Sequence, residues 1–136
     1  MSRGQDLVEF ALISTLVIFV LVLGVQYALL GQTVLALGQS ASTIARYAAV
    51  NPGTVSSGKA SSLPTAVQNM LSPNLLSNGG ADLTVTLTSS PGTAFGDTCT
   101  VSLSYSATSE IMLPNPFFGI PLFPTTLIAQ DSQLYE

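Results

Sequence analysis

The first third of the chain is dominated by apolar side chains. From Phe10 to Leu30 the sequence is a nearly continuous run of Leu, Val, Ile, Phe and Ala. Crossing a bilayer takes about 20 apolar residues, so this run is long enough to span one. The apolar core of a removed secretory signal is only about 7–15 residues long, which fits the run poorly. The pattern therefore predicts a membrane-spanning helix near the N-terminus.

The helical pattern continues beyond the length that a membrane needs. From Gln32 to Val50 apolar residues are mixed with small and hydroxyl residues, and Asn51-Pro52-Gly53 follows. The residue before a proline avoids the α region and glycine tolerates positive φ, so this tripeptide ends a helix. We expect one helix over residues 5–50, about 70 Å long at 1.5 Å per residue. Its first half suits lipid, and its outer half suits packing against protein.

Residues 51–80 predict a polar linker that contains one short helix. Gly and Ser are frequent at its start, and Ser77–Gly80 has the composition of a turn. Within the linker, Pro64–Leu71 predicts the short helix, with Ser62 near its cap and Pro64 in its first turn.

Residues 81–136 predict a small β-rich domain. Apolar and polar residues alternate over Leu83–Thr88 and again over Cys99–Tyr105. Such alternation is typical of strands with one buried face, and Ser89–Asp97 can connect the two as an antiparallel hairpin. Thr125–Leu134 predicts a third strand. The expected fold class is therefore α+β, with one long N-terminal helix followed by a small antiparallel sheet.

A sheet of three or four strands with one apolar face is not stable alone in water, so we expect the outer half of the helix to cover it. The segment 112–124 holds four prolines, which cannot donate ladder hydrogen bonds and predict a loop. Its apolar residues have two interpretations: they fold back onto the sheet as core, or they form contacts between subunits. These residues are Phe117, Phe118, Ile120, Leu122 and Phe123.

The composition excludes several classes of function. Only 7% of residues are charged, against about 25% in soluble domains, and acidic residues outnumber basic ones. A nucleic-acid binder needs a basic surface, which this chain lacks. With no His and one Cys, metal and haem ligands and the usual nucleophile–base pairs are missing, so we expect neither an enzyme nor a cofactor. The inward position of Cys99 predicts a buried, inert thiol with no internal disulfide partner.

Three charged residues precede the apolar run. Arg3 is its only basic neighbour, and the positive-inside rule places the N-terminus in the cytoplasm and the rest of the chain outside. Asp6 suits the first helical turn, where a carboxylate complements the helix dipole. Glu9 adjoins Phe10, where a charge drawn into hydrocarbon costs a few kcal/mol. Glu9 either stays at the level of the lipid headgroups or finds a cationic partner in an assembly.

Small residues recur every seven positions along the predicted helix, at Gly24, Gly31, Gly38 and Ala45. At 3.6 residues per turn these positions drift slowly around one face and leave a small-residue groove. Membrane helices tolerate glycine in general, which is one interpretation of the pattern. The other is a stripe for close contact between helices.

The start of the chain resembles a known family. Arg3-Gly4-Gln5-Asp6-Leu7-Val8-Glu9-Phe10, leading directly into a long apolar helix, is similar to the start of type IV-like pilins. The resemblance is greatest to the tight-adherence branch, the TadE-like pilins and pseudopilins and their Flp relatives. The helix end ASTIARYAAV and the tail, with VSLSY and LPNPFFGIPLFP, also resemble the TadE pattern.

The resemblance implies a processing site and an assembly site. In this family a prepilin peptidase cuts after a glycine, and a glutamate is the fifth residue of the mature chain. Residues 1–4 would then be a short basic leader, cut between Gly4 and Gln5, and Glu9 with Phe10 would act in assembly. The new amino group at Gln5 of a neighbouring copy would pair with Glu9. If the leader is retained, Arg3 is available instead.

We therefore expect a structural subunit of an extracellular type IV-like pilus for surface attachment. Its partners would be further copies in a helical filament, the cytoplasmic membrane before assembly, the prepilin peptidase and the pilus assembly platform. Two alternatives stay open. The chain could be a minor TadE-like pseudopilin that primes assembly, or a single-pass membrane-anchored protein whose outer domain binds a partner.

Overall fold

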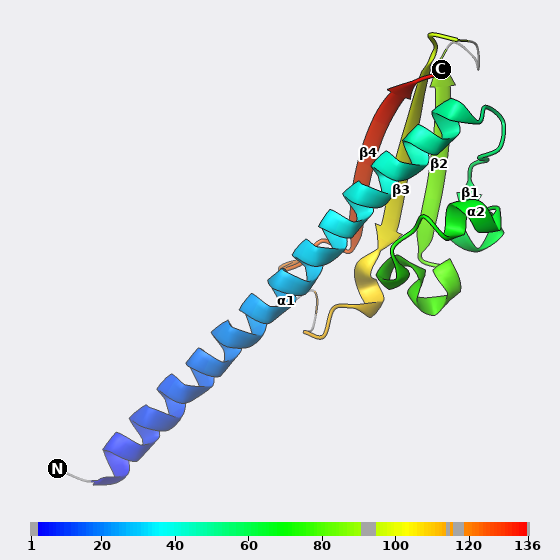
Figure 1. The fold of residues 1–136 in the computed structure, drawn as a ribbon. Helices are drawn as coiled ribbons and strands as arrows, with labels where there is room; N and C mark the ends of the chain where they lie inside the picture. Colours follow the sequence, from blue (N-terminus) through cyan, green and yellow to red (C-terminus); the bar gives the residue numbers. More distant parts are fainter. Residues whose placement is uncertain (1–2, 91–94, 114, 116–118, 136) are drawn as a thin grey trace.

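The computed structural model describes residues 3–90, 95–113, 115 and 119–135. One long helix, α1 (Arg3–Val50), projects from a small domain built on a four-stranded sheet (Figure 1). The layout is α+β, as the sequence predicts. The chain order of the remaining elements is β1 (Gly58–Lys59), η1 (Ala60–Ser62), α2 (Thr65–Gln68), η2 (Pro73–Gly80), β2 (Leu83–Ser90), β3 (Thr98–Ser106), η3 (Ala107–Ser109) and β4 (Thr126–Leu134).

Helix α1 starts two residues before the expected position and ends at Val50. At its C-terminus the backbone N–H of Asn51 donates to the carbonyl of Tyr47 over 2.9 Å, and the Asn51 side-chain amide donates to the same carbonyl over 3.1 Å. Pro52 then prevents further helix, and Gly53 takes a φ of 82° that favours glycine. The end of the helix is thus determined by local sequence.

All neighbouring strands of the sheet are antiparallel, in the order β1-β2-β3-β4. The predicted hairpin is confirmed by the pairing of β2 with β3, in which Leu87 lies opposite Val101. The predicted third strand is β4, which pairs with β3 so that Leu103 lies opposite Ala129. The two-residue strand β1 was not predicted, because a strand this short has no period to detect.

The linker differs from the prediction in further ways, and the predicted turn at its end lies in η2. Helix α2 is only four residues long, and Pro64 stands at its N-cap position, with φ −54° and ψ 143°, rather than in its first turn. Ser62 does not cap it, since its hydroxyl donates to the carbonyl of Lys59 over 2.8 Å. A helix of one turn has too few internal hydrogen bonds to extend on its own, so tertiary contacts decide its length.

The second half of α1 packs on one face of the sheet and forms the core with it. Burial alternates strictly along β3, as period two requires. The buried free thiol of Cys99 confirms its predicted inward position. The fully buried side chains of this core include Leu37, Ala41, Ile44, Ala45, Val67, Leu75, Leu83, Val85, Cys99, Val101, Leu103 and Tyr105.

Candidate functional site

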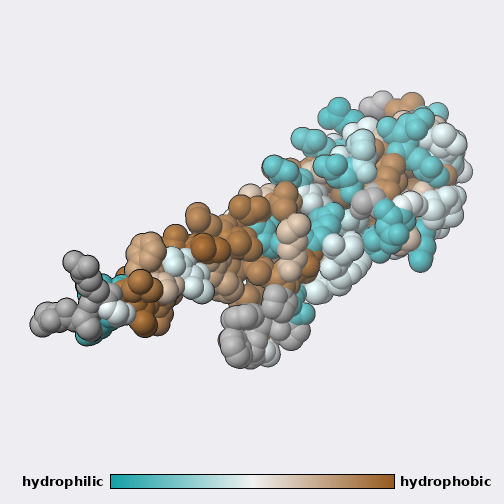
Figure 2. Space-filling view, turned by 90° about the horizontal axis from the view of Figure 1, so that it is seen from below, coloured by the Kyte–Doolittle hydropathy of each residue, from teal (hydrophilic) through white to brown (hydrophobic). Residues whose placement is uncertain are grey.

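The first half of α1 extends away from the domain and is mostly exposed, although Phe19 and Leu23 are half-buried and Leu23 packs against the domain core. We call residues 4–25 the free half; in Figure 2 its surface is mostly hydrophobic, whereas the domain is largely hydrophilic. Leu7 is 70% exposed and Phe10 is 71% exposed, whereas large apolar side chains of soluble proteins are usually buried. Its exposed large apolar side chains are Leu7, Val8, Phe10, Leu12, Ile13, Leu16, Val17, Ile18, Val20, Leu21, Val22 and Val25.

The dimensions of the free half match a bilayer. At 1.5 Å per residue it extends about 33 Å, and the hydrocarbon core of a membrane is about 30 Å thick. By length and hydropathy α1 could cross a membrane, and its most apolar stretch has no buried residue. Ser14 and Thr15 do not oppose this, because both hydroxyls donate to the carbonyl of Ala11, at 2.9 and 2.8 Å. The polar hydroxyls are therefore satisfied within the helix.

The residues that the resemblance implicates in processing and assembly all lie at the free end of α1. Gly4 and Gln5 are exposed and helical, as are Glu9 and Phe10. The structure thus places Glu9 on an apolar surface, far along the helix from the domain.

The predicted small-residue stripe is open over most of its length. A Cβ built on Gly24, Gly31 or Gly38 would meet nothing within 4 Å. Ala45 differs, because it is fully buried in the domain core. Each step of seven residues turns about 20° around the helix, so the stripe rotates under the sheet by its fourth member. The open groove is therefore Gly24, Gly31 and Gly38 only.

A second series with the same spacing attaches α1 to the domain. Gln26, Thr33 and Ser40 are the buried polar residues of the part of the chain that the structure describes, and each makes a hydrogen bond to the domain. We call this series the polar seam. Sequence reasoning missed it, although its seven-residue repeat lies just two positions beyond the glycines. Among the described residues, no buried side-chain nitrogen or oxygen lacks a partner.

Glu110, which follows η3, is the main partner of the polar seam. Gln26 Nε2 donates to the Glu110 carbonyl over 2.9 Å, and Gln26 Oε1 accepts from the Met112 N–H over 3.1 Å. The Glu110 carboxylate accepts from Thr33 Oγ1 at 3.0 Å and from the Tyr105 hydroxyl at 2.7 Å. The carboxylate therefore joins helix and sheet, and Gln26 joins the helix to the start of the Pro-rich segment. Higher up, Ser40 Oγ accepts from the Ser72 N–H over 3.3 Å.

The Pro-rich segment is also bound to α1. The Tyr27 hydroxyl donates to the Leu122 carbonyl over 2.8 Å, and its ring lies 5.1 Å from that of Phe123. Phe123 is buried and Leu122 is half-buried, so for these two residues the core interpretation is correct. Ile120 is 63% exposed and remains available for contacts. Phe117 and Phe118 lie outside the described residues.

The sheet face opposite α1 is lined with hydroxyl groups. We call it the hydroxyl face. Side chains of this face on neighbouring strands form hydrogen bonds with each other. Thr100 and Ser132 lie 3.0 Å apart, and Gln130 Nε2 donates to Ser102 Oγ over 3.3 Å. Lys59 of β1, exposed and directly opposite Thr84, places one positive charge at the border of this face. Its polar members are Thr84, Thr86, Thr88, Thr98, Thr100, Ser102, Ser104, Ser106, Thr126, Gln130 and Ser132, with Ile128 and Leu134 exposed among them.

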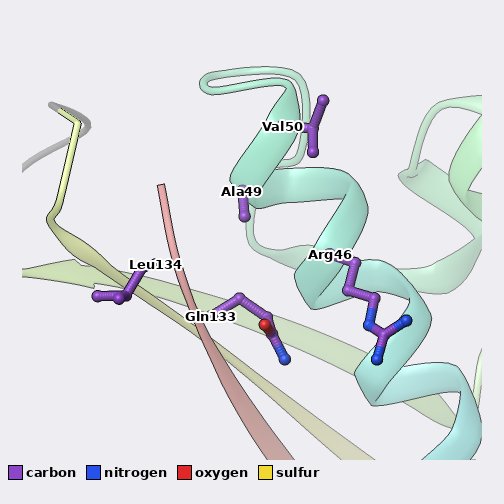
Figure 3. Close-up of a pocket in the computed structure, with 5 residues that line it drawn as sticks. All are labelled: Arg46, Ala49, Val50, Gln133 and Leu134. Carbon is purple, nitrogen blue, oxygen red and sulfur yellow. The ribbon is translucent and has the colours of Figure 1, made fainter. Parts of the chain in front are cut away.

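A shallow hollow of about 330 Å³ lies between the last turns of α1 and the end of β4. Figure 3 shows its lining, with Arg46, Ala49 and Val50 on the helix and Gln133 and Leu134 on the strand. It is open and lacks any cluster of reactive groups. Across the described part of the chain, no three His, Cys, Asp or Glu side chains are grouped so that they could hold a metal ion.

Beside this hollow, Asp131 has a perturbed acidity. The pKa of its carboxyl is lowered, chiefly by the hydrogen bond from the Gln133 side chain, while partial desolvation opposes the shift. The Ser132 N–H, the Ser42 hydroxyl and the charge of Arg46 lower the pKa further. Asp131 is thus held as an anion between β4 and α1.

No family model, curated protein or solved structure matches this chain.

Proposed function

We propose that this protein is a structural subunit of an extracellular type IV-like pilus of the tight-adherence kind. The observation that carries the proposal is the free half of α1, an apolar rod about 33 Å long whose large apolar side chains, from Leu7 to Val22, are mostly exposed. An uncovered apolar surface of this size marks a membrane or protein interface. The rod is continuous with a helix firmly attached to a water-facing domain, so each copy presents the same rod.

Polymerisation would transfer the free half from lipid to a bundle of identical helices. Both environments are apolar, so the transfer exposes little apolar surface to water and costs little free energy. Before assembly the N-terminus would face the cytoplasm and the domain would lie outside. After assembly the free halves would form the filament core.

The open glycines support this arrangement. Gly24, Gly31 and Gly38 keep part of α1 free of side chains, and no contact within the monomer requires them. Each costs the helix about 1 kcal/mol relative to alanine. Close approach of a neighbouring helix would offset that cost.

Glu9 supports the proposal through its charge. A carboxylate beside the apolar run is unfavourable in a filament core unless a cation compensates it. The amino group of a neighbouring copy, created by cleavage after Gly4, would supply that cation. Prepilin peptidase and an assembly platform are the partners that this route requires.

The free half also suits a single-pass anchor, because its length matches one bilayer. A minor TadE-like subunit that primes assembly would use the same helix. Mechanical shearing of cells distinguishes these functions. A major subunit dominates the sheared fibres, a minor one is present at low copy number, and an anchored domain stays with the membrane.

The decisive experiment replaces Gly31 by leucine, with Gly31→Ala as the matched control. A Cβ at Gly31 meets nothing within 4 Å and the position is exposed on the helix, so we expect both variants to fold and insert in the membrane. We expect Gly31→Leu to abolish surface fibres and Gly31→Ala to retain them. If Gly31→Leu cells bear normal fibres, or if the surface protein proves monomeric, the proposal fails.

A further inference from the structure

The two edges of the sheet pose a problem for a protein displayed in many copies. An edge strand presents unpaired N–H and C=O groups that can pair with the sheet of another molecule. Here the edges belong to β2, beyond its short partner β1, and to β4. Strand β4 is nine residues long and contains neither Pro nor Lys, the residues that commonly protect an edge.

The edge of β2 is closed partly by backbone and partly by one side chain. Strand β1 pairs with only two residues, Thr84 and Val85. One step further along, the Leu87 N–H donates to Ser57 Oγ over 2.9 Å, and Ser57 Oγ donates to the Leu87 carbonyl over 3.3 Å. A single hydroxyl therefore satisfies the donor and the acceptor that a pairing strand would use.

The edge of β4 carries a comparable device. The Ser132 N–H donates to Asp131 Oδ1 over 2.9 Å, while Asp131 Oδ2 accepts from Gln133 Nε2 over 3.2 Å. Alternate residues of an antiparallel edge strand direct their N–H groups outward. The Ser132 bond therefore identifies Ile128 and Gln130, which share its parity, as outward donors too. A strand that approached this edge would have to displace an anionic carboxylate from its donors.

We propose that Ser57 and Asp131 prevent edge-to-edge pairing between copies of this chain. If an edge pairs with the same edge of a second copy, the result is a closed two-fold dimer. If β4 of one copy pairs with β2 of the next, the result is an open-ended ribbon. Both are competing assemblies for copies held side by side. The proposal concerns the domain and does not rest on the existence of a pilus.

The test uses the full chain in detergent micelles, followed by sedimentation. Ser57→Ala and Asp131→Ala each open one edge, and we expect each to shift the protein toward dimers. The double variant should form larger, polydisperse species. Ser57→Thr keeps the hydroxyl and Asp131→Asn keeps an acceptor oxygen, so both should sediment as the original chain does.

Dimers in each single variant and larger species only in the double variant would indicate edge pairing. Aggregation caused by unfolding would not depend in this way on how many edges are opened. The proposal is wrong if the double variant sediments like the original chain, or if the conservative variants associate as the alanine variants do. Failure of fibre formation in cells would leave this result unaffected.

Amide hydrogen exchange of the unaltered chain tests the Ser57 and Asp131 hydrogen bonds directly, even if an alanine variant does not fold. We expect the amides of Leu87 and Ser132 to exchange with solvent about tenfold more slowly than those of Ile128 and Gln130. Equal exchange at Ser132 and Gln130 would overturn the role of Asp131. Rapid exchange at Leu87 would do the same for Ser57.

Discussion

Gln26, at the middle of α1, and Glu110, just after η3, are joined by a hydrogen bond of 2.9 Å between Gln26 Nε2 and the Glu110 carbonyl oxygen. The same side chain accepts from the Met112 N–H. Gln26 is therefore the point at which the free half of the helix ends and the attached half begins. The Gln26 side chain satisfies one backbone acceptor and one backbone donor at once, as a neighbouring strand does in a sheet.

Replacement of Gln26 by leucine should destabilise the domain. The substitution removes the side-chain partner of the Glu110 carbonyl and of the Met112 N–H, two part-buried hydrogen bonds, at a cost of about 0.5–1.5 kcal/mol for each. Gln32→Leu is the matched control, since Gln32 is exposed and the change should stay within about 0.5 kcal/mol. Chemical denaturation in detergent measures both. Equal stabilities for the two variants would contradict the polar seam.

The Tyr105 hydroxyl should contribute through the Glu110 carboxylate. Tyr105→Phe removes a 2.7 Å donor to the Glu110 carboxylate, so we expect a loss of about 1–3 kcal/mol in the free energy of unfolding. Tyr47→Phe, at a half-buried position on α1, serves as the comparison and should cost less. A Tyr105→Phe chain that unfolds at the same denaturant concentration as the original would show that the carboxylate is satisfied by other means.

Acid should weaken the contact between β4 and α1 through Asp131. Its folded-state pKa is lowered, mainly by Gln133, so the folded state holds fewer protons than the unfolded state near pH 4. The stabilisation is fully present above the unfolded pKa of about 3.9 and is lost as the pH falls through the lower folded pKa. Unfolding followed between pH 7 and pH 2 should show a smaller acid dependence in Asp131→Asn than in the original chain. Identical pH profiles would exclude this contribution.

Glu9 should be needed for assembly and dispensable for folding. It touches nothing in the domain, so Glu9→Ala should fold and insert as the original chain does. We expect the variant to accumulate in the membrane without forming surface fibres. Asp6→Ala, which removes a neighbouring exposed carboxylate, should still form fibres. Fibres in Glu9→Ala cells at the normal level would contradict the proposed pairing.

The surface form of the protein should begin at Gln5. N-terminal sequencing of sheared material checks this directly, and Gly4→Leu should block the cleavage and leave the longer chain in the membrane. A surface form that begins before Gln5 would contradict processing after Gly4. The cation for Glu9 would then have to come from Arg3.

Several parts of the fold were predictable because neighbouring residues determine them. Asn51-Pro52-Gly53 ends α1 whatever lies around it, since proline prevents the helical conformation of the residue before it. The alternation over Leu83–Thr88 and Cys99–Tyr105 specified two strands and placed Cys99 on the buried face. Strand β1 and helix α2 were less accessible, because elements of two and four residues depend on their surroundings.

The candidate site was predictable only in part. The apolar run defined the free half, and the seven-residue repeat of glycines proved open at three of its four expected positions. The Pro-rich segment divided in a way that composition did not indicate, with Phe123 in the core and Ile120 exposed. Ser57 gave no signal at all, because a serine in a Ser-rich linker is indistinguishable from its neighbours until a strand edge lies beside it.

By itself the sequence determined that a long apolar helix precedes a small β-rich domain, because hydrophobic periodicity and helix-ending residues act over a few positions. Only the tertiary structure decided which face of that helix meets the sheet. Gln26 and Glu110 are 84 positions apart, and Thr33 and Glu110 are 77 apart. No local pattern specifies such pairs, since their hydrogen bonds form only after the chain has brought distant residues together.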